Sequence, residues 1–289
     1  MVEVTLWCSL SAAPGAKCKL DIGAKDIREL FRKLSEKYPA FEPLIDHSIA
    51  FAIDGTICRD TQSNRYTIKP NTRLKMTARS FRRYTNLAAT LRILRNRCLT
   101  LLSPETWDDK NDAFFMAEYK RLMNVKSVLA ICLAVREETY HHWQVFSRGA
   151  DGVCIEFDAD KLLEAFDHAA GIRHKIVRYE LLQDVRTMND IDVERLPFMK
   201  RWPYGDESEY RAVYVDDKVQ KASYDVPITI GSINRITLSP WLAPALVPAV
   251  KETFKSLQGC SNLKVYRSTL IDNPQWKKLT GRVAMPIVP

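Results

Sequence analysis

The sequence lacks the features of a membrane protein or a disulfide-stabilised secreted protein. No stretch approaches the roughly 20 consecutive apolar residues that a membrane-spanning helix needs. The start, MVEVTLWCSL, has no basic segment before its apolar run, so we expect no signal peptide. The seven cysteines are scattered, odd in number and without a CxxC pair, which argues against a disulfide framework and against structural zinc. We therefore expect a reduced, cytoplasmic protein.

Familiar catalytic signatures are also missing. The sequence contains no P-loop, GxGxxG, HExxH or GxSxG motif. It has no internal repeat, no Gly/Ser-rich linker, and no zinc finger, RNP signature or heptad repeat. Any active site must therefore be assembled from residues that lie far apart in the chain.

The composition is that of a globular protein with a basic balance. A length of 289 residues favours two domains, and 46% hydrophobic residues are enough for a sizeable core. The formal net charge is +8, and six arginines fall within residues 79–97 with no acidic residue among them. A solvated helix face is the simplest explanation. The alternative is a nucleic-acid-binding surface made of Arg79, Arg92, Arg95 and Arg97.

Residues 1–79 are expected to form the first domain. The pattern predicts strands over residues 2–6, 18–22, 49–53, 66–68 and 73–78, with turns at Pro14-Gly15 and Asp54-Gly55. A capping box of Asp26 and Glu29 opens a helix with a stripe of apolar residues. This order is that of a β-grasp sheet wrapped around one helix.

The first domain resembles the ubiquitin-like sulfur-carrier proteins of molybdopterin and thiamine synthesis. The similarity lies in "LFRKLSEKYPAFEPLI", "AFAIDG" and "IKPNTRLKMTAR". Those carriers end in an exposed Gly-Gly, whereas here the matching strand ends at Arg79-Ser80 and the chain continues. The resemblance therefore implies a β-grasp module that docks a protein or regulates the second domain, and not a sulfur carrier.

Residues 80–289 are expected to form an α+β domain, because strands and helices alternate without βαβ regularity. Asn86 and Asp158 are predicted N-caps, and a late helix is predicted to end near Leu257. Predicted strands cover residues 98–102, 126–135, 153–157, 175–179, 210–215, 226–238 (with a break at Gly231) and 265–268. The segment "SPETWDDKNDAFF" is predicted to be a polar loop, and His141-His142 an exposed loop pair.

Three distant segments carry residues suited to cleaving a dinucleotide. They are "RRYT" at residues 82–85, "YHHWQVF" at residues 140–146 and "ESEYR" at residues 207–211. An arginine can hold phosphate or ribose oxygens, and aromatic rings can stack on nicotinamide. Two carboxylates in a strand at i and i+2 face the same side and raise the pKa of one of them. Such a pair can stabilise an oxocarbenium-like charge and take up a proton.

The region from residue 81 to about 272 looks like the bacterial domain of unknown function 2971 family. Its motifs here are "RRYT", "SPETWDDKNDAFF", "WQVFSRGADGVCIEF" and "ESEYR". The family usually has Asn-Asp-Pro where this chain has Asp108-Asp109-Lys110, and Tyr in place of Phe146.

The same region is similar to the ADP-ribosyltransferase fold, in its strand–helix–strand opening with Arg-Tyr-Thr and its late Glu-x-Glu. The resemblance implies NAD as substrate, a cofactor-binding set of Arg83 (with Arg82 as its rival), Tyr84, Thr85 and Trp143, and a catalytic pair of Glu209 and Glu207. In these roles Glu209 would bond the ribose hydroxyl and Glu207 would activate the acceptor. No Ser-Thr-Ser strand is present.

Our hypothesis is an ADP-ribosyltransferase-like enzyme that modifies a protein or nucleic acid. Its fusion to a ubiquitin-like module suggests, by analogy alone, a bacterial toxin or antiviral-defence effector. A non-catalytic adaptor is the alternative, with a protein on the β-grasp domain and nucleic acid on the basic face. A metal nuclease that uses Asp108, Asp112 and Glu209 is a third. The carboxylate pair could also form surface ion pairs with Lys200, Arg201 or Arg211.

Overall fold

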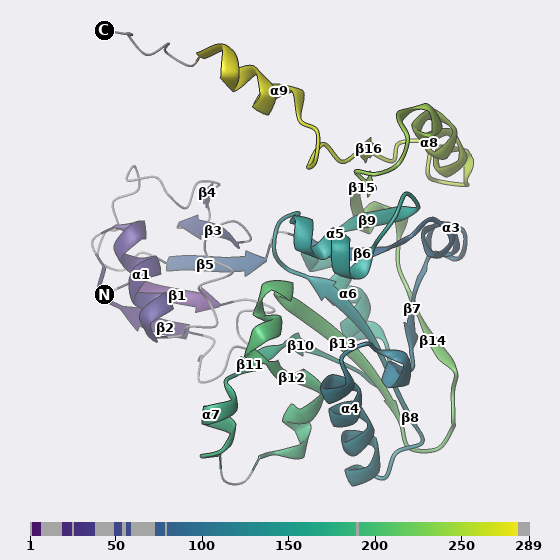
Figure 1. Ribbon diagram of the computed structural model, residues 1–289. Helices are drawn as coiled ribbons and strands as arrows, with labels where there is room; N and C mark the ends of the chain where they lie inside the picture. Colours follow the sequence, from purple (N-terminus) through teal and green to yellow (C-terminus); the bar gives the residue numbers. More distant parts are fainter. Residues whose placement is uncertain are drawn as a thin grey trace, which may run out of the picture.

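A computed structural model describes residues 2–6, 19–24, 26–37, 49–53, 56–58, 73–78, 80–188 and 191–282. Helices and strands are mixed along this part of the chain, so the predicted α+β class is confirmed (Figure 1). One sheet is built from strands before residue 79, and a larger sheet from strands after it. None of the helices described combines the length and apolar character needed to cross a lipid bilayer.

The first sheet has five strands in the order β2-β1-β5-β3-β4. They are β1 (Val2–Leu6), β2 (Lys19–Ile22), β3 (Ile49–Ile53), β4 (Thr56–Cys58) and β5 (Arg73–Ala78). Strands β1 and β5 are parallel, and the other neighbours are antiparallel.

Helix α1 (Ile27–Lys37) belongs to the same part of the chain. The predicted cap is confirmed, because the Asp26 carboxylate accepts a hydrogen bond of 2.8 Å from the Glu29 N–H. Leu30 and Leu34 are fully buried, as the predicted stripe requires. The predicted turns at Pro14-Gly15 and Asp54-Gly55 and the strand at residues 66–68 lie outside the described residues.

The second sheet has nine strands. They are β6 (Ser80–Asn86), β7 (Cys98–Leu102), β8 (Ser127–Ala134), β9 (Gly152–Asp158), β10 (Ile172–Ile176), β13 (Glu209–Asp216), β14 (Ser223–Pro227), β15 (Ile233–Leu238) and β16 (Val265–Arg267). The main path runs β10-β13-β8-β6-β9-β15-β16, and a branch leads from β8 through β7 to β14. The break predicted at Gly231 is confirmed, since β14 and β15 are separate strands.

Strand β8 is the branch point of this sheet. It pairs with β13 over its whole length, whereas it meets β6 only where Ala134 faces Arg82, and β7 only where Ala130 faces Leu102. The strand that begins with Glu209 and the strand that carries the Arg-Arg-Tyr-Thr segment therefore flank the same end of β8.

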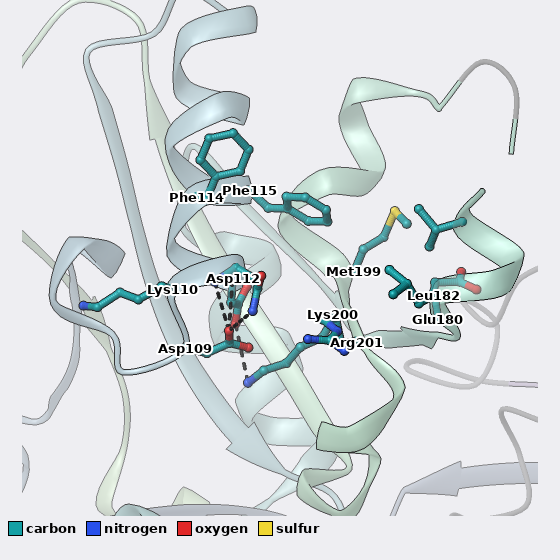
Figure 2. A pocket seen from close by; sticks show the side chains of 12 residues that line it. Asp109, Lys110, Asp112, Phe114, Phe115, Glu180, Leu182, Met199, Lys200 and Arg201 are labelled. Carbon is teal, nitrogen blue, oxygen red and sulfur yellow. Dashed lines mark hydrogen bonds and ion pairs between the residues drawn. The ribbon is translucent and has the colours of Figure 1, made fainter.

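Helix α4 (Lys110–Leu122) corrects the prediction of a polar loop at residues 103–115 (Figure 2). The Asp109 carboxylate accepts hydrogen bonds from the N–H groups of Asn111 at 3.0 Å and Asp112 at 3.4 Å. The polar run is therefore an N-cap followed by a first helical turn, which residue composition alone does not distinguish from a loop. A short parallel pair beside this helix, β11 (Arg178–Glu180) and β12 (Met199–Arg201), replaces the end of the strand predicted over residues 175–179.

The other helices of the second part follow the sequence in part. Three were predicted, α3 (Leu87–Asn96), α6 (Ala159–His168) and α8 (Val247–Ser256), whereas α5 (Tyr140–Phe146), α7 (Leu182–Val185) and α9 (Pro274–Lys277) were not. The predicted N-caps are confirmed, because Asn86 accepts from the Ala89 N–H and Asp158 from the Lys161 N–H.

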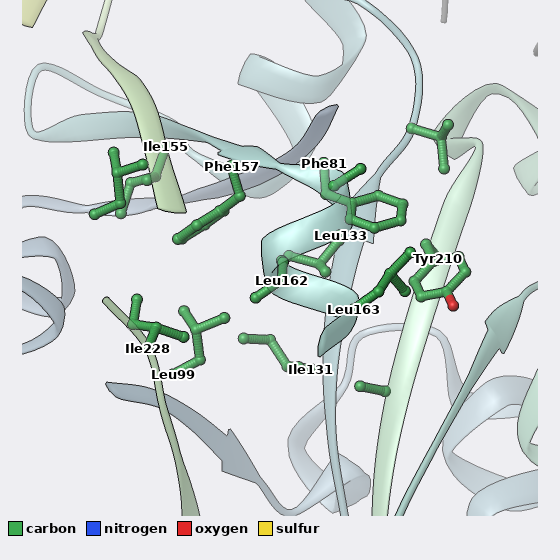
Figure 3. Packing of buried hydrophobic residues seen from close by; sticks show 14 of the residues in the cluster. Phe81, Leu99, Ile131, Leu133, Ile155, Phe157, Leu162, Leu163, Tyr210 and Ile228 are labelled. Carbon is green, nitrogen blue, oxygen red and sulfur yellow. The ribbon is translucent and has the colours of Figure 1, made fainter. Parts of the chain in front are cut away.

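One face of the second sheet packs into the main hydrophobic core (Figure 3). Phe81, Leu133 and Tyr210 come from three neighbouring strands, and Leu162 comes from α6. The Phe81 and Tyr210 rings stack with centroids 4.5 Å apart. Because side chains alternate along a strand, burial of Tyr210 on this face turns Glu209 and Arg211 to the opposite one.

Gly152, the first residue of β9, occupies a place where a side chain does not fit. A Cβ there would overlap the Ser147 carbonyl oxygen and lie 2.9 Å from the Ser147 Oγ. We expect Gly152→Ala to lower the free energy of unfolding by about 1–3 kcal/mol, because an overpacked site must shift its neighbours. Urea unfolding measures this, with Gly205→Ala as control, since no atom lies within 4 Å of a Cβ at that position. Equal losses in the two variants would contradict the steric reason.

Candidate active site

A cluster of charged side chains lies on the face of the second sheet opposite the main core. Arg211 is fully buried and binds two carboxylates. Its Nε and Nη2 lie 2.6 and 2.9 Å from Glu209 Oε1 and Oε2, and its Nη1 and Nη2 lie 2.8 and 2.7 Å from Asp112 Oδ1 and Oδ2. The planar guanidinium thus joins β13 to α4 through two bidentate pairs.

Lys200 of β12 is the second cation of the cluster. Its Nζ lies 2.6 Å from Glu207 Oε2, 3.5 Å from Glu209 Oε2 and 3.5 Å from Asp112 Oδ2. The Lys200 side chain is only 8% exposed, so these contacts are shielded from bulk water. Three carboxylates therefore share two cations, and the cluster carries one surplus acidic group.

The two glutamates meet through a turn and not through strand alternation. Glu209 is the first residue of β13, but Glu207 ends a 3-10 helix, η5 (Trp202–Glu207). Ser208 between them is in the left-handed region with φ 44°. The expectation that both carboxylates extend from one strand is therefore wrong, although both side chains reach Lys200. The ion pairs that the alternative expected with Lys200 and Arg211 do form, but they are buried and not on the surface, because Glu207 and Glu209 are 5% and 4% exposed.

The environments of the two glutamates push their pKa values apart. Burial raises the pKa of Glu207 to about 7, although Lys200 opposes this shift. Burial alone would also raise the pKa of Glu209, but Arg211 and Lys200 outweigh it and lower the pKa to about 2. At neutral pH Glu209 is ionised and Glu207 can gain or lose a proton, which is the usual arrangement of an electrostatic stabiliser and a general base.

A cavity of about 380 Å³ opens beside the cluster (Figure 2). We call it the α4–α7 pocket, and it is lined by Asp109, Lys110, Asn111, Asp112, Phe114, Phe115, Glu180, Leu182, Val185, Met199, Lys200 and Arg201. Lys200 and Asp112 belong both to the lining and to the charged cluster. Glu207 and Glu209 contact Lys200 but are not themselves among the lining residues.

The two rival arginines of the Arg-Arg-Tyr-Thr segment have different surroundings. Arg82 is held by Glu137 at 2.8 Å and Glu156 at 2.9 Å, with its side chain 4% exposed. Arg83 is half-buried, donates from Nη1 to the Cys132 carbonyl oxygen at 3.0 Å, and interacts electrostatically with Glu209. Of the two, Arg83 is the one associated with the carboxylates.

The other predicted cofactor-binding residues lie together where α5 contacts β6. Trp143 is fully buried and donates from Nε1 to Glu138 Oε1 at 2.7 Å. Tyr84 is 5% exposed and meets Trp143 edge to face, with ring centroids 5.3 Å apart. The Thr85 carbonyl accepts a hydrogen bond from Ser147 Oγ. None of the three lines the α4–α7 pocket, and neither do Arg83 and Glu209, so the expectation that positions 83, 143 and 209 share one cleft is not met in this pocket.

The sequence did not reveal a role for His142. It was predicted to be exposed, but it lies in α5 with no exposed surface, and this prediction is wrong. Its Nε2 lies 2.9 Å from the Glu207 carbonyl oxygen and its Nδ1 2.6 Å from Thr139 Oγ1. Burial lowers the pKa of His142 to about 4, so the neutral ring donates to Glu207 and accepts from Thr139. His142 thereby fixes the backbone of the glutamate turn to α5.

The basic segment does not form one surface. Arg79 lies outside the described residues, and Arg82 and Arg83 point inward. Arg92, Arg95 and Arg97 on or just after α3 are exposed. The Arg92 guanidinium pairs with Asp225 at 2.9 Å, and Arg97 donates to the Gln258 carbonyl at 3.4 Å.

Within the described ranges, no group of three or more His, Cys, Asp or Glu side chains could hold a metal ion. Two of the carboxylates that the nuclease alternative requires, Asp112 and Glu209, are bound by Arg211. No family model matches the chain, and a search of curated proteins finds no match either.

Proposed function

We propose that the chain is an ADP-ribosyltransferase-like enzyme that transfers ADP-ribose from NAD to a macromolecular acceptor. The observation that carries this proposal is the glutamate pair itself: an ionised Glu209 and a titratable Glu207 converge on Lys200, next to an open pocket. Arg83, associated electrostatically with Glu209, supports it further.

The proposed reaction gives each residue a distinct task. The bond between nicotinamide and the ribose C1′ breaks, and neutral nicotinamide leaves with the bonding electron pair. Glu209 stabilises the positive charge that develops on the ribose, since its carboxylate stays ionised at neutral pH. The acceptor forms the new bond to C1′, and Glu207 takes the proton that the acceptor loses. Arg83 is assigned to a phosphate or ribose oxygen of NAD.

The first sheet supports a β-grasp assignment for residues 1–79. Parallel β1 and β5 at its centre, with α1 between β2 and β3 in the chain, are the order expected of that fold. We propose that this module docks a protein partner, and that the whole chain acts as a toxin or antiviral-defence effector. The effector role rests on the analogy alone.

A nicotinamide-release assay tests the enzymatic proposal. We expect the purified chain to release nicotinamide from NAD, and Glu209→Gln to reduce the rate by about a hundredfold, the size of effect seen when one preorganised electrostatic group is removed. The glutamine can still accept from Arg211 Nε, so the fold should persist, and thermal unfolding checks this.

Glu156→Gln is the matched control for this assay. Glu156 also pairs with two arginines, Arg82 and Arg235, each at 2.9 Å, but it lies outside the proposed site. Its rate should stay within a factor of about two of wild type, because its partners Arg82 and Arg235 take no part in the proposed reaction. If the wild-type chain does not turn over NAD, or if both variants lose the same share of the nicotinamide-release rate, the non-catalytic adaptor is favoured.

A further inference from the structure

We propose that the α4–α7 pocket is the acceptor site and that it takes a nucleotide base. The identity of the acceptor rests on the proposed transfer reaction, whereas binding of the base does not. In the reaction a ring or exocyclic nitrogen of the base forms the bond to C1′, nicotinamide leaves with its electron pair, and the nitrogen's proton passes to Glu207.

The walls of the pocket suit a flat aromatic ring. Phe114 and Phe115 of α4 lie on one side and Met199 and Leu182 on the other (Figure 2). The Phe114 side chain is 60% exposed, and Leu182 is 55% exposed. A base that stacks on such a ring gains roughly 1–3 kcal/mol, whatever its sequence. The cavity volume of about 380 Å³ is at the lower end of small-molecule sites, which span about 300–1,000 Å³.

The polar part of the lining suits the edge of a base. Asn111 Nδ2 donates to Asp109 Oδ1 at 3.1 Å, which leaves its second N–H and its carbonyl oxygen for a ligand, and Asp109 Oδ2 has no hydrogen-bond partner among the described residues. An unpaired, buried carboxylate oxygen is costly unless a donor reaches it. The N–H groups on the edge of a base are donors of this kind.

Two cations of the lining, Lys110 and Arg201, are available for a phosphate, and Lys110 donates to the Trp107 carbonyl oxygen at 3.0 Å. Of the three acidic members, Asp109 caps α4, Asp112 is bound by Arg211, and Glu180 lies 3.5 Å from Arg195. Arg201 is exposed at the pocket and has no acidic partner within the part of the chain that the structure describes. A guanidinium next to a stacking ring is the arrangement that binds single-stranded nucleic acid, and the formal charge of +8 favours a polyanionic partner.

Fluorescence anisotropy with 12-nucleotide single strands of DNA and RNA, each labelled at one end, tests this assignment. The NAD-free chain should bind them at low salt, and Phe114→Ala should weaken binding by about tenfold, because one stacked base is lost. Arg201→Ala should reduce the slope of log K against log salt concentration by about 1, because one phosphate contact is lost. Leu122→Ala is the matched control, since Leu122 is exposed on the same helix but outside the pocket.

Competition by AMP and GMP distinguishes the source of the base. If AMP or GMP displaces the labelled strand, and Phe114→Ala abolishes this displacement, the pocket is assigned to a free nucleotide. If only unlabelled strands displace it, the pocket is assigned to a nucleic acid. Both outcomes support the base site. Strand binding that survives Phe114→Ala and Arg201→Ala but is lost in a double Arg95→Ala/Arg97→Ala variant overturns it, because the nucleic acid would then lie on α3.

The two proposals fail in different ways. If wild type binds strands through Phe114 but releases no nicotinamide, the base site stands and the transfer reaction falls. If nicotinamide is released and a protein, not a strand, gains the ADP-ribose, the acceptor assignment falls and the enzymatic proposal stands. Mass spectrometry of the strand and of the added protein after incubation with NAD separates these results.

Discussion

Replacing Arg211 with alanine is expected to lower the free energy of unfolding by about 3–5 kcal/mol. The substitution removes four hydrogen bonds to carboxylates and leaves Asp112 and Glu209 buried, with Lys200 as the ion-pair partner that they still share. Uncompensated charge in a dry environment costs far more than the loss of an exposed ion pair. Urea unfolding at neutral pH measures the change.

Arg235→Ala is the appropriate comparison. Arg235 also belongs to the second sheet and pairs with a carboxylate, Glu156, at 2.9 Å, but its side chain is 45% exposed. Its loss should cost less than about 1 kcal/mol, because solvent screens the pair. A loss of similar size in both variants would show that burial does not determine the strength of the Arg211 contacts.

Local sequence rules accounted well for elements whose causes lie within a few residues. The caps at Asn86 and Asp158 and the stripe of α1 depend on side chains three or four positions apart, and the structure places them as predicted. The same rules misread residues 103–115, because a capped first turn rich in Asp and Asn has the composition of a loop.

The candidate site depended on contacts that no local pattern specifies. Arg211 binds Asp112, which is 99 positions away in the chain, and Lys200 reaches Glu207 only because β12 lies beside the turn. The sequence identified the glutamates through their spacing, but the left-handed Ser208 between them could not be read from it. His142 was missed because a buried and an exposed histidine look alike in a polar segment.

Glu207→Gln is expected to make the chain more stable at pH 8 but not at pH 5. Burial raises the pKa of Glu207 to about 7 in the folded chain, against an ordinary value of 4.5. Between these two values the folded state binds more protons than the unfolded state, so stability falls as the pH rises through this window. With about 1.4 kcal/mol for each pKa unit, ionised Glu207 costs about 3 kcal/mol above pH 7. Glutamine resembles the protonated side chain and avoids that cost.

The neighbours of Glu207 define how the measurement is interpreted. Lys200 and Arg211 favour its ionised form, and Glu209 disfavours it. Burial lowers the pKa of His142 to about 4 in wild type and variant alike, so its contribution cancels in the difference. The difference in unfolding free energy between wild type and Glu207→Gln, followed by urea unfolding from pH 5 to pH 8, therefore isolates one group. Asp206→Asn, at a neighbouring carboxylate that is 74% exposed, should change the free energy of unfolding by less than about 1 kcal/mol, because solvent screens its charge. A difference for Glu207→Gln that does not change with pH would mean that Lys200 keeps Glu207 ionised throughout, and Glu207 could then not serve as the base that takes a proton from the acceptor.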